Sequence, residues 1–170
     1  STIGTSSKSQ GASQVMSVIL RPYVPADFNR ICEIRELNSP ERRERFLARL
    51  AKPGEWFDHY LHLAIESDGV LVGDFQLRFC DYTTPDGAWD MGLELSEDAR
   101  GKGFGTQALV AGTEYAFAHG AHRIQGSTDE ANIAMRRAFE KEGYNSKPYI
   151  KAQEIISTEI LGLRFTAKMV

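Results

Sequence analysis

The sequence has few cysteines, no long apolar run and no strong charge of one sign. Its only cysteines, Cys32 and Cys80, are too few for a disulfide framework and lack metal-ligand spacing. The four histidines do not form a metal-binding pattern either. We therefore expect two reduced thiols, no metal and a cytoplasmic location.

The weak charge and the mixed hydropathy exclude two classes of partner. The chain carries 20 basic and 23 acidic side chains, a formal net charge of -3, which gives no footprint for nonspecific nucleic-acid binding. No run approaches the roughly 18 apolar residues that would indicate a membrane span. We expect neither nucleic acid nor membrane as a partner.

The length of 170 residues suits one domain. Residues 1–14 are rich in Ser, Gly, Thr and Gln and contain no apolar stretch. They are expected to be a flexible arm or an added remnant rather than a secretory signal. Residues 15–170 are then expected to form a single domain.

Periodicity and turn signals predict a strand, two helices, three strands, a helix, a strand, a helix and a C-terminal strand region. Asp68-Gly69 is a hairpin signal, Ser39 before Pro40 and Glu41 is a helix N-cap signal, and glycines 120 and 143 mark helix ends. Alternation places Leu71, Phe75, Leu77 and Phe79 on one strand face. Strands are predicted at 15–23 (stopped by Pro22), 61–66, 71–79, 89–95, 122–127 and 161–169, and helices at 25–38, 39–51, 104–119 and 129–142.

This order predicts an α/β fold built on a mixed sheet. Strand 89–95, helix 104–119 and strand 122–127 form a βαβ unit, which makes the two strands parallel with a right-handed crossover. The hairpin before them is antiparallel. A mixed sheet with helices on its faces accommodates both arrangements.

A glycine-rich turn, Arg100 to Thr106, lies between strand 89–95 and the following helix. Helix N-termini have free N–H groups and partial positive charge, so they bind phosphates, and glycine lets the backbone approach the oxygens. The spacing does not match a Walker loop. A dinucleotide fingerprint fits at Gly101 and Gly103 but not at Thr106, and Asp129 could serve as its ribose-binding acid, so that alternative stays open.

Two blocks of sequence resemble the superfamily of GCN5-related N-acetyltransferases. Arg100, Gly103 and Gly105 fit its Arg/Gln-x-x-Gly-x-Gly/Ala pattern, and the block from Glu130 to Tyr144 resembles its second motif, with an Asn at 132 and a closing Gly-Tyr. The resemblance covers residues 89–144 well, whereas residues 17–80 fit only in element order. It is similar to the branch of ribosomal-protein alanine and serine N-acetyltransferases.

The resemblance implies a mostly antiparallel, twisted sheet with helices on both faces and acetyl-CoA as co-substrate. It implies direct transfer without an acyl-enzyme. It also implies that Leu93 and Leu95 bind pantetheine through their backbone, with Asn132 nearby. The residues implied for the diphosphate are Arg100, Gly101, Lys102, Gly103, Phe104, Gly105 and Thr106.

Acetyl transfer to an amine needs a base, because a free alkyl ammonium has a pKa near 10. Asp90 and Glu94 share one strand face with Gly92 and are the candidate bases. Asp86 is a weaker one. An acid in this branch often stands at the position of Asp90, whereas Glu94 replaces what is commonly an aromatic or apolar residue.

The proton donor is harder to identify. Where many family members carry Tyr or Ser, this chain has Phe139 and Met135, which cannot donate a proton and fit an amphipathic core helix. Tyr144 and Tyr149 are weaker candidates. The thiolate could also leave unassisted or take its proton from water.

The expected acceptor is a primary amine of an antibiotic-like or polyamine-like small molecule, or a protein N-terminus. Helices 25–51, segment 54–60 and the C-terminal strands would build its site. His62 could face the acceptor site. Trp56, Phe57 and Tyr60 could form the floor of this site or pack in the core. The alternatives are a non-catalytic acyl-CoA-binding regulator and a dinucleotide enzyme. A homodimer is compatible with each.

Overall fold

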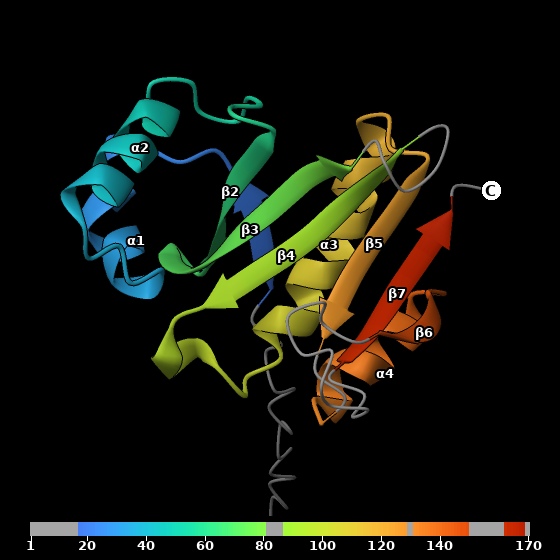
Figure 1. The fold of residues 1–170 in the computed structure, drawn as a ribbon. Coiled ribbons are helices and arrows are strands. Elements are labelled where there is room, and N and C mark those ends of the chain that lie inside the picture. The colour runs from blue at the N-terminus through green and yellow to red at the C-terminus, as the bar shows by residue number, and fades with distance from the viewer. Residues whose placement is uncertain (1–16, 81–86, 129–130, 150–161, 169–170) are drawn as a thin grey trace, which may run out of the picture.

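The computed structural model describes residues 17–80, 87–128, 131–149 and 162–168 (Figure 1). The strands and helices follow one another in the predicted order, with one further strand at Asn145–Tyr149 and two short 3₁₀ turns at Pro25–Asp27 and Glu97–Ala99. The strands are β1 (Val18–Arg21), β2 (Tyr60–Ser67), β3 (Val70–Cys80), β4 (Ala88–Leu95), β5 (Arg123–Thr128), β6 (Asn145–Tyr149) and β7 (Gly162–Lys168). The helices are α1 (Phe28–Ile34), α2 (Pro40–Leu50), α3 (Phe104–Ala118) and α4 (Ile133–Lys141).

The strands form one sheet of seven in the order β1-β2-β3-β4-β5-β7-β6. Every neighbouring pair is antiparallel except β4 and β5, which are parallel and joined through α3. The βαβ unit and the mostly antiparallel mixed sheet are therefore confirmed.

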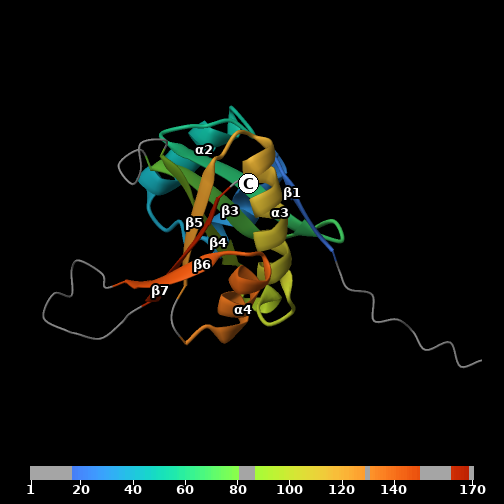
Figure 2. The same cartoon turned by 90° about the vertical axis from the view of Figure 1, so that its right-hand side faces the viewer.

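Two apolar clusters cover the two faces of the sheet. On one face α3 and α4 pack side by side, as Figures 1 and 2 show, over a core centred on Phe75, Leu109 and Phe165, each fully buried. On the other face α1 and α2 cover a smaller cluster built around Ile31 and Phe46. The three-layer arrangement places polar side chains of β2, β3 and β4 under α1 and α2.

A bulge in β3 overturns one predicted strand face. Ile65 pairs with Gly73, whereas Glu66 pairs with Leu71, so Val72 is an extra residue in the ladder. Leu71 consequently packs with the α1–α2 cluster, while Val72 joins the α3 side. The prediction that Leu71 shares a face with Phe75 was wrong, because a bulge reverses alternation.

Helix α1 ends four residues earlier than predicted. Glu36 adopts a left-handed conformation (φ 52°), its N–H donates to Glu33 O, and the N–H of Leu37 donates to Cys32 O. This is the hydrogen-bond pattern of a Schellman helix end, which usually carries glycine. Leu37 is 2% exposed, so its burial holds a terminus that the sequence does not mark.

Side-chain caps set the starts of two other helices. Ser39 Oγ accepts the N–H of Arg42 at the start of α2, as predicted. Asn132 Oδ1 accepts the N–H of Met135, so α4 begins at Ile133 rather than at the predicted 129. Strand β6 was not located from the sequence, because its order comes from pairing with β7.

Candidate active site

Strands β4 and β5 pair over only three residues. The parallel register joins Trp89 to Ile124 and ends where Met91 meets Gly126. Strand β4 nevertheless continues to Leu95, paired with β3 on its other side. Beyond Met91 the edge of β4 that faces β5 is therefore outside the ladder, and its peptide groups can bind an extended ligand.

The glycine-rich turn leads from the end of β4 into α3. Gly101 (φ 75°) and Gly103 (φ 82°) are both left-handed, which explains the residue type at these two positions. A Cβ on either would meet no atom within 4 Å. The first helical bond runs from the N–H of Gln107 to Gly103 O, so the three preceding amides have no intrahelical acceptor at the positive end of a 15-residue helix.

The side chains of this turn divide between core and solvent. Phe104 is 4% exposed and packs in the large core, which anchors the turn, whereas Arg100 and Lys102 are exposed. A ligand at the turn would thus meet backbone amides flanked by two cations.

Three predicted cofactor-binding segments meet beside Gly105. The Cβ position of Gly105 lies 3.5 Å from Met135 Sδ of α4, 3.7 Å from Leu95 Cδ1 and 3.9 Å from Leu93 Cδ1. Asn132 is exposed at the N-terminus of the same α4. Its cap uses the carbonyl oxygen, so the side-chain amide hydrogens can bond another group.

The predicted acids flank an open position on β4. In the register of β3 and β4, Asp90 lies opposite Arg78 and Glu94 opposite Asp74. Asp90 Oδ2 is 3.5 Å from Arg78 Nη2, and Glu94 Oε1 is 3.5 Å from the Gln76 amide nitrogen. Between the acids stands Gly92, exposed and opposite Gln76, with no atom within 4 Å of its Cβ position.

A buried carboxylate organises the polar face behind these acids. Asp74 is fully buried and accepts hydrogen bonds from Tyr23 Oη at 2.7 Å and Gln76 Nε2 at 2.9 Å. His62 Nδ1 lies 3.0 Å from Asp74 Oδ2, and Arg35 Nε lies 3.4 Å from the same oxygen. Burial and the adjacent Asp74 raise the pKa of the Tyr23 hydroxyl well above its ordinary value.

Sequence reasoning missed Asp74, Tyr23, Gln76 and Arg35. The available signal was a lone acid inside the apolar strand 70–80, where an unpaired charge is costly to bury. Partners for such a charge come from other elements, here β1's extension, β2 and the end of α1. Their convergence depends on the tertiary structure.

A hollow of about 300 Å³ lies between α2 and the polar ends of β2 and β3. Its lining includes His62 and Tyr60, in line with their expected place at the acceptor site. Trp56 is instead 41% exposed and meets Trp89 edge to face at 5.2 Å, and Phe57 lies under the Arg49 guanidinium at 5.3 Å. The hollow is lined by Arg35, Leu37, Arg42, Arg45, Phe46, Arg49, Asp58, Tyr60, His62 and Gln76.

The residues at the positions where the family often carries its proton donor lie in the core, as does the weaker candidate Tyr144. Phe139 is 3% exposed and stacks on Phe165 at 4.5 Å, and Met135 packs against the same cluster, so both are core residues as expected. Tyr144 Oη is 2.6 Å from Thr113 Oγ1, and burial raises the pKa of Tyr144 to about 12. Asp86, Asp129 and the side chains of Tyr149 and Cys80 lie outside the described part of the structure.

Within the described residues, no group of three or more His, Cys, Asp or Glu side chains could hold a metal ion. The helices among these residues are too short or too polar to cross a membrane.

Comparison with known proteins identifies a family. The model of the "Acetyltransferase (GNAT) domain" matches residues 17–145. Spermidine/spermine N-acetyltransferase SpeG from Vibrio cholerae, solved with manganese ions, superposes with a TM-score of 0.68 at 14% identity, covering 89% of this chain and 92% of that one. RimJ from Mycobacterium smegmatis, in complex with CoA-disulfide, gives 0.66 at 18% identity, covering 91% and 83%. No curated protein matches the sequence.

Proposed function

Because the chain belongs to the acetyltransferase (GNAT) domain family, we propose that it transfers the acetyl group of acetyl-CoA directly to a primary amine on the α1–α2 side of the sheet. The chain is an N-acetyltransferase, and enzymes of this family use acetyl-CoA as the donor. The observation that best supports binding of the acetyl donor is that the glycine-rich turn, the free edge of β4 and the start of α4 meet beside Gly105.

The donor would lie along the edge of β4 that β5 leaves free. We assign the diphosphate to the amides from Gly101 to Thr106, with Arg100 and Lys102 adding charge from the side. Pantetheine would run past Leu93 and Leu95, hydrogen-bonded to their peptide groups in the manner of an added strand. We assign Asn132, at the start of α4, to the same arm, which it would bond through its side-chain amide.

The acceptor amine would approach β4 at Gly92, where no side chain intervenes. Asp90 or Glu94, on either side, would take a proton from the ammonium directly or through one water, which leaves a neutral nucleophile. The amine nitrogen then forms a bond to the thioester carbon, and the C–S bond breaks. The second amine proton goes to solvent, or to the same carboxylate once it has released the first proton to solvent, and the thiolate departs.

The developing oxyanion needs hydrogen-bond donors at the same place. Peptide N–H groups on the free edge of β4 are fixed donors in a partly desolvated setting, where such donors contribute about 3 kcal/mol each to lowering the barrier. Phe139 and Met135 cannot protonate the thiolate, so it would leave as the anion or take a proton from water. Holding both substrates in reach supplies the rest of the rate enhancement.

Two measurements test this function. Calorimetric titration with acetyl-CoA, ATP and NAD should show that acetyl-CoA binds most tightly, whereas tighter NAD binding would favour the dinucleotide alternative. A thiol-release assay over a panel of primary amines should show turnover. Tight acetyl-CoA binding without turnover on any amine would favour a non-catalytic regulator instead.

A further inference from the structure

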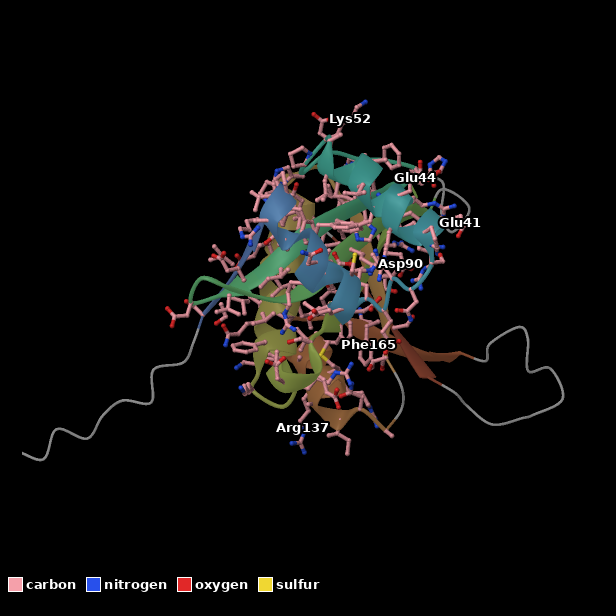
Figure 3. All side chains as sticks on the ribbon, turned by 90° about the vertical axis from the view of Figure 1, so that its left-hand side faces the viewer. Glu41, Glu44, Lys52, Asp90, Arg137 and Phe165 are labelled. Carbon is pink, nitrogen blue, oxygen red and sulfur yellow. The ribbon has the colours of Figure 1, made fainter. Side chains whose placement is uncertain are left out.

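The hollow beside α2 is lined by four arginines. Arg42, Arg45 and Arg49 follow one another at helical spacings of three and four, so they share one face of α2. Arg35, at the C-terminus of α1, completes the set from the opposite side. Glu41 and Glu44, labelled in Figure 3, occupy other positions of α2 and are not among the residues that line the hollow.

Among the described residues, few carboxylates neutralise the cationic lining. Asp58 is the one described acid that lines the hollow, against four guanidinium groups, although the whole chain is net negative. Arg35 is the exception, since it pairs with Asp74 and approaches Glu94 at 3.9 Å. In the described part of the chain, Arg45 forms no ion pair.

The other two arginines are held in place by backbone carbonyls. Arg42 Nη1 donates to Glu36 O at 3.0 Å, and Arg49 Nη1 donates to Phe57 O at 2.8 Å and Tyr60 O at 3.3 Å. These bonds orient the guanidinium groups without reducing their charge. Burial and the nearby charge of Arg35 lower the pKa of Arg49, as expected where cations crowd a partly desolvated site.

The hollow adjoins the proposed reaction site. Gln76 lines the hollow and lies opposite Gly92, and neighbouring strands are about 4.8 Å apart. Arg35 spans both places, because it lines the hollow and approaches Glu94. A molecule with its amine at Gly92 would therefore extend its other end toward the arginines of α2.

We propose that the acceptor carries an anionic group, a carboxylate or a phosphonate, which Arg42, Arg45 and Arg49 bind while its amine reaches Gly92. Guanidinium groups match both anions with paired hydrogen bonds. A polyamine would instead bring a second ammonium into a cluster of like charges, which disfavours it. This inference rests on the proposed acetyl transfer and names its substrate class.

The test is a matched set of straight-chain amines of three to six carbons, ending in a carboxylate, a phosphonate, a hydroxyl or a second amine. Each is titrated calorimetrically into the enzyme saturated with CoA, so that no turnover occurs. We expect the best anionic amine to bind at least tenfold more tightly than the matched alcohol and the diamine to bind most weakly. The tighter of the two anionic sets identifies the group.

Single substitutions test whether the arginines of α2 cause the preference for an anionic amine. Arg45→Gln should weaken binding of the anionic amine at least tenfold and that of the alcohol far less, and Arg45→Lys should restore part of the loss. Lys52→Gln removes the same charge from the turn after α2, well away from Asp90 in Figure 3. This control variant should bind the anionic amine and the alcohol as tightly as the wild type does.

Equal affinity for alcohol, diamine and anionic amine, no binding by any of them, or identical effects of Arg45→Gln and Lys52→Gln would overturn the inference. A parallel titration with acetyl-CoA separates this failure from a failure of the proposed function. If acetyl-CoA binds and the anionic preference is absent, only the substrate class is wrong. If acetyl-CoA does not bind, the acetyl-transfer proposal itself fails.

Discussion

Gly92 on β4 lies opposite Gln76 on β3, and the side chain that Gly92 lacks would meet no atom within 4 Å. An exposed, side-chain-free position between two carboxylates is unusual for the middle of a sheet, where glycine weakens the strand. Gly92 lies on the part of β4 beyond the β5 ladder, and its partner Gln76 lines the arginine-lined hollow. In the proposed function the missing side chain leaves room for the acceptor, which can be tested by filling this position.

Gly92→Val should abolish or strongly reduce turnover while leaving acetyl-CoA affinity unchanged. The isopropyl group would occupy the proposed approach of the amine, whereas we place the donor along the backbone edge of β4. Stability should stay equal or rise slightly, because valine favours strands. Turnover, calorimetry and thermal melting check the three expectations, with Gly92→Ala as an intermediate. Unchanged turnover in Gly92→Val would place the acceptor elsewhere.

Gly103→Asp should abolish acetyl-CoA binding and leave the fold intact. The added carboxylate would point into open space where we place the diphosphate, and the left-handed backbone costs about 1–2 kcal/mol for a residue with a side chain. Gly69→Asp is the matched control, because Gly69 is also left-handed and open but lies in the β2–β3 hairpin. Both variants should melt a few degrees lower, and only Gly103→Asp should fail to bind. Equal binding by the two would remove the diphosphate from this turn.

Asp90→Asn and Glu94→Gln separate the two candidate bases. Loss of the base should lower kcat/KM about 10²–10⁴-fold and remove the acidic limb of the pH–rate profile. Loss of the other carboxylate should lower kcat/KM much less and leave the acidic limb of the pH–rate profile in place. Acetyl-CoA affinity, measured by calorimetry, should be unaffected in both. An unaltered pH profile in both variants would assign the proton transfer to another group, and His62 would be examined next.

Asp27→Asn should destabilise the protein near neutral pH by about 1–3 kcal/mol. Arg21 donates to both Asp27 oxygens, at 2.8 and 3.0 Å, and these bonds lower the Asp27 pKa in the folded protein. A lowered folded-state pKa contributes stability above the unfolded value of about 3.9, and this contribution is lost as pH falls through the folded value.

Urea unfolding at a series of pH values checks this expectation. The difference between wild type and Asp27→Asn should be largest near pH 7 and shrink below about pH 4. Asp68→Asn is the control, because Asp68 is exposed in the hairpin and forms no ion pair among the described residues. A difference that stays constant with pH would contradict the ionic origin.

Elements whose signals are local were predicted well. The Asp68-Gly69 hairpin, the cap at Ser39 and the closing glycines 120 and 143 depend on residues adjacent in sequence, and each is where the sequence predicts it. Three errors concern features with no local signal: the bulge at Val72, the glycine-free end of α1 at Glu36 and the strand β6. The start of α4 was also predicted too early, although Asn132 caps it locally.

The family could be recognised from sequence, and so could the turn to which we assign the donor, because the turn's chemistry comes from backbone amides and glycine conformations within seven residues, Arg100 to Thr106. The acceptor side could not. Asp74 contacts Tyr23, His62 and Gln76, which come from three strands or their extensions. The arginines of α2 line one hollow with side chains of β2 and β3 only when that helix covers these strands.

Local spacing thus determined the proposed diphosphate site, since one turn supplies its amides and its two cations. Long-range packing decided what lies on the proposed acceptor side. Charges distant in the chain share a pocket only after burial of Phe46 and Ile31 docks two helices on the sheet, and no periodicity in the sequence records that docking.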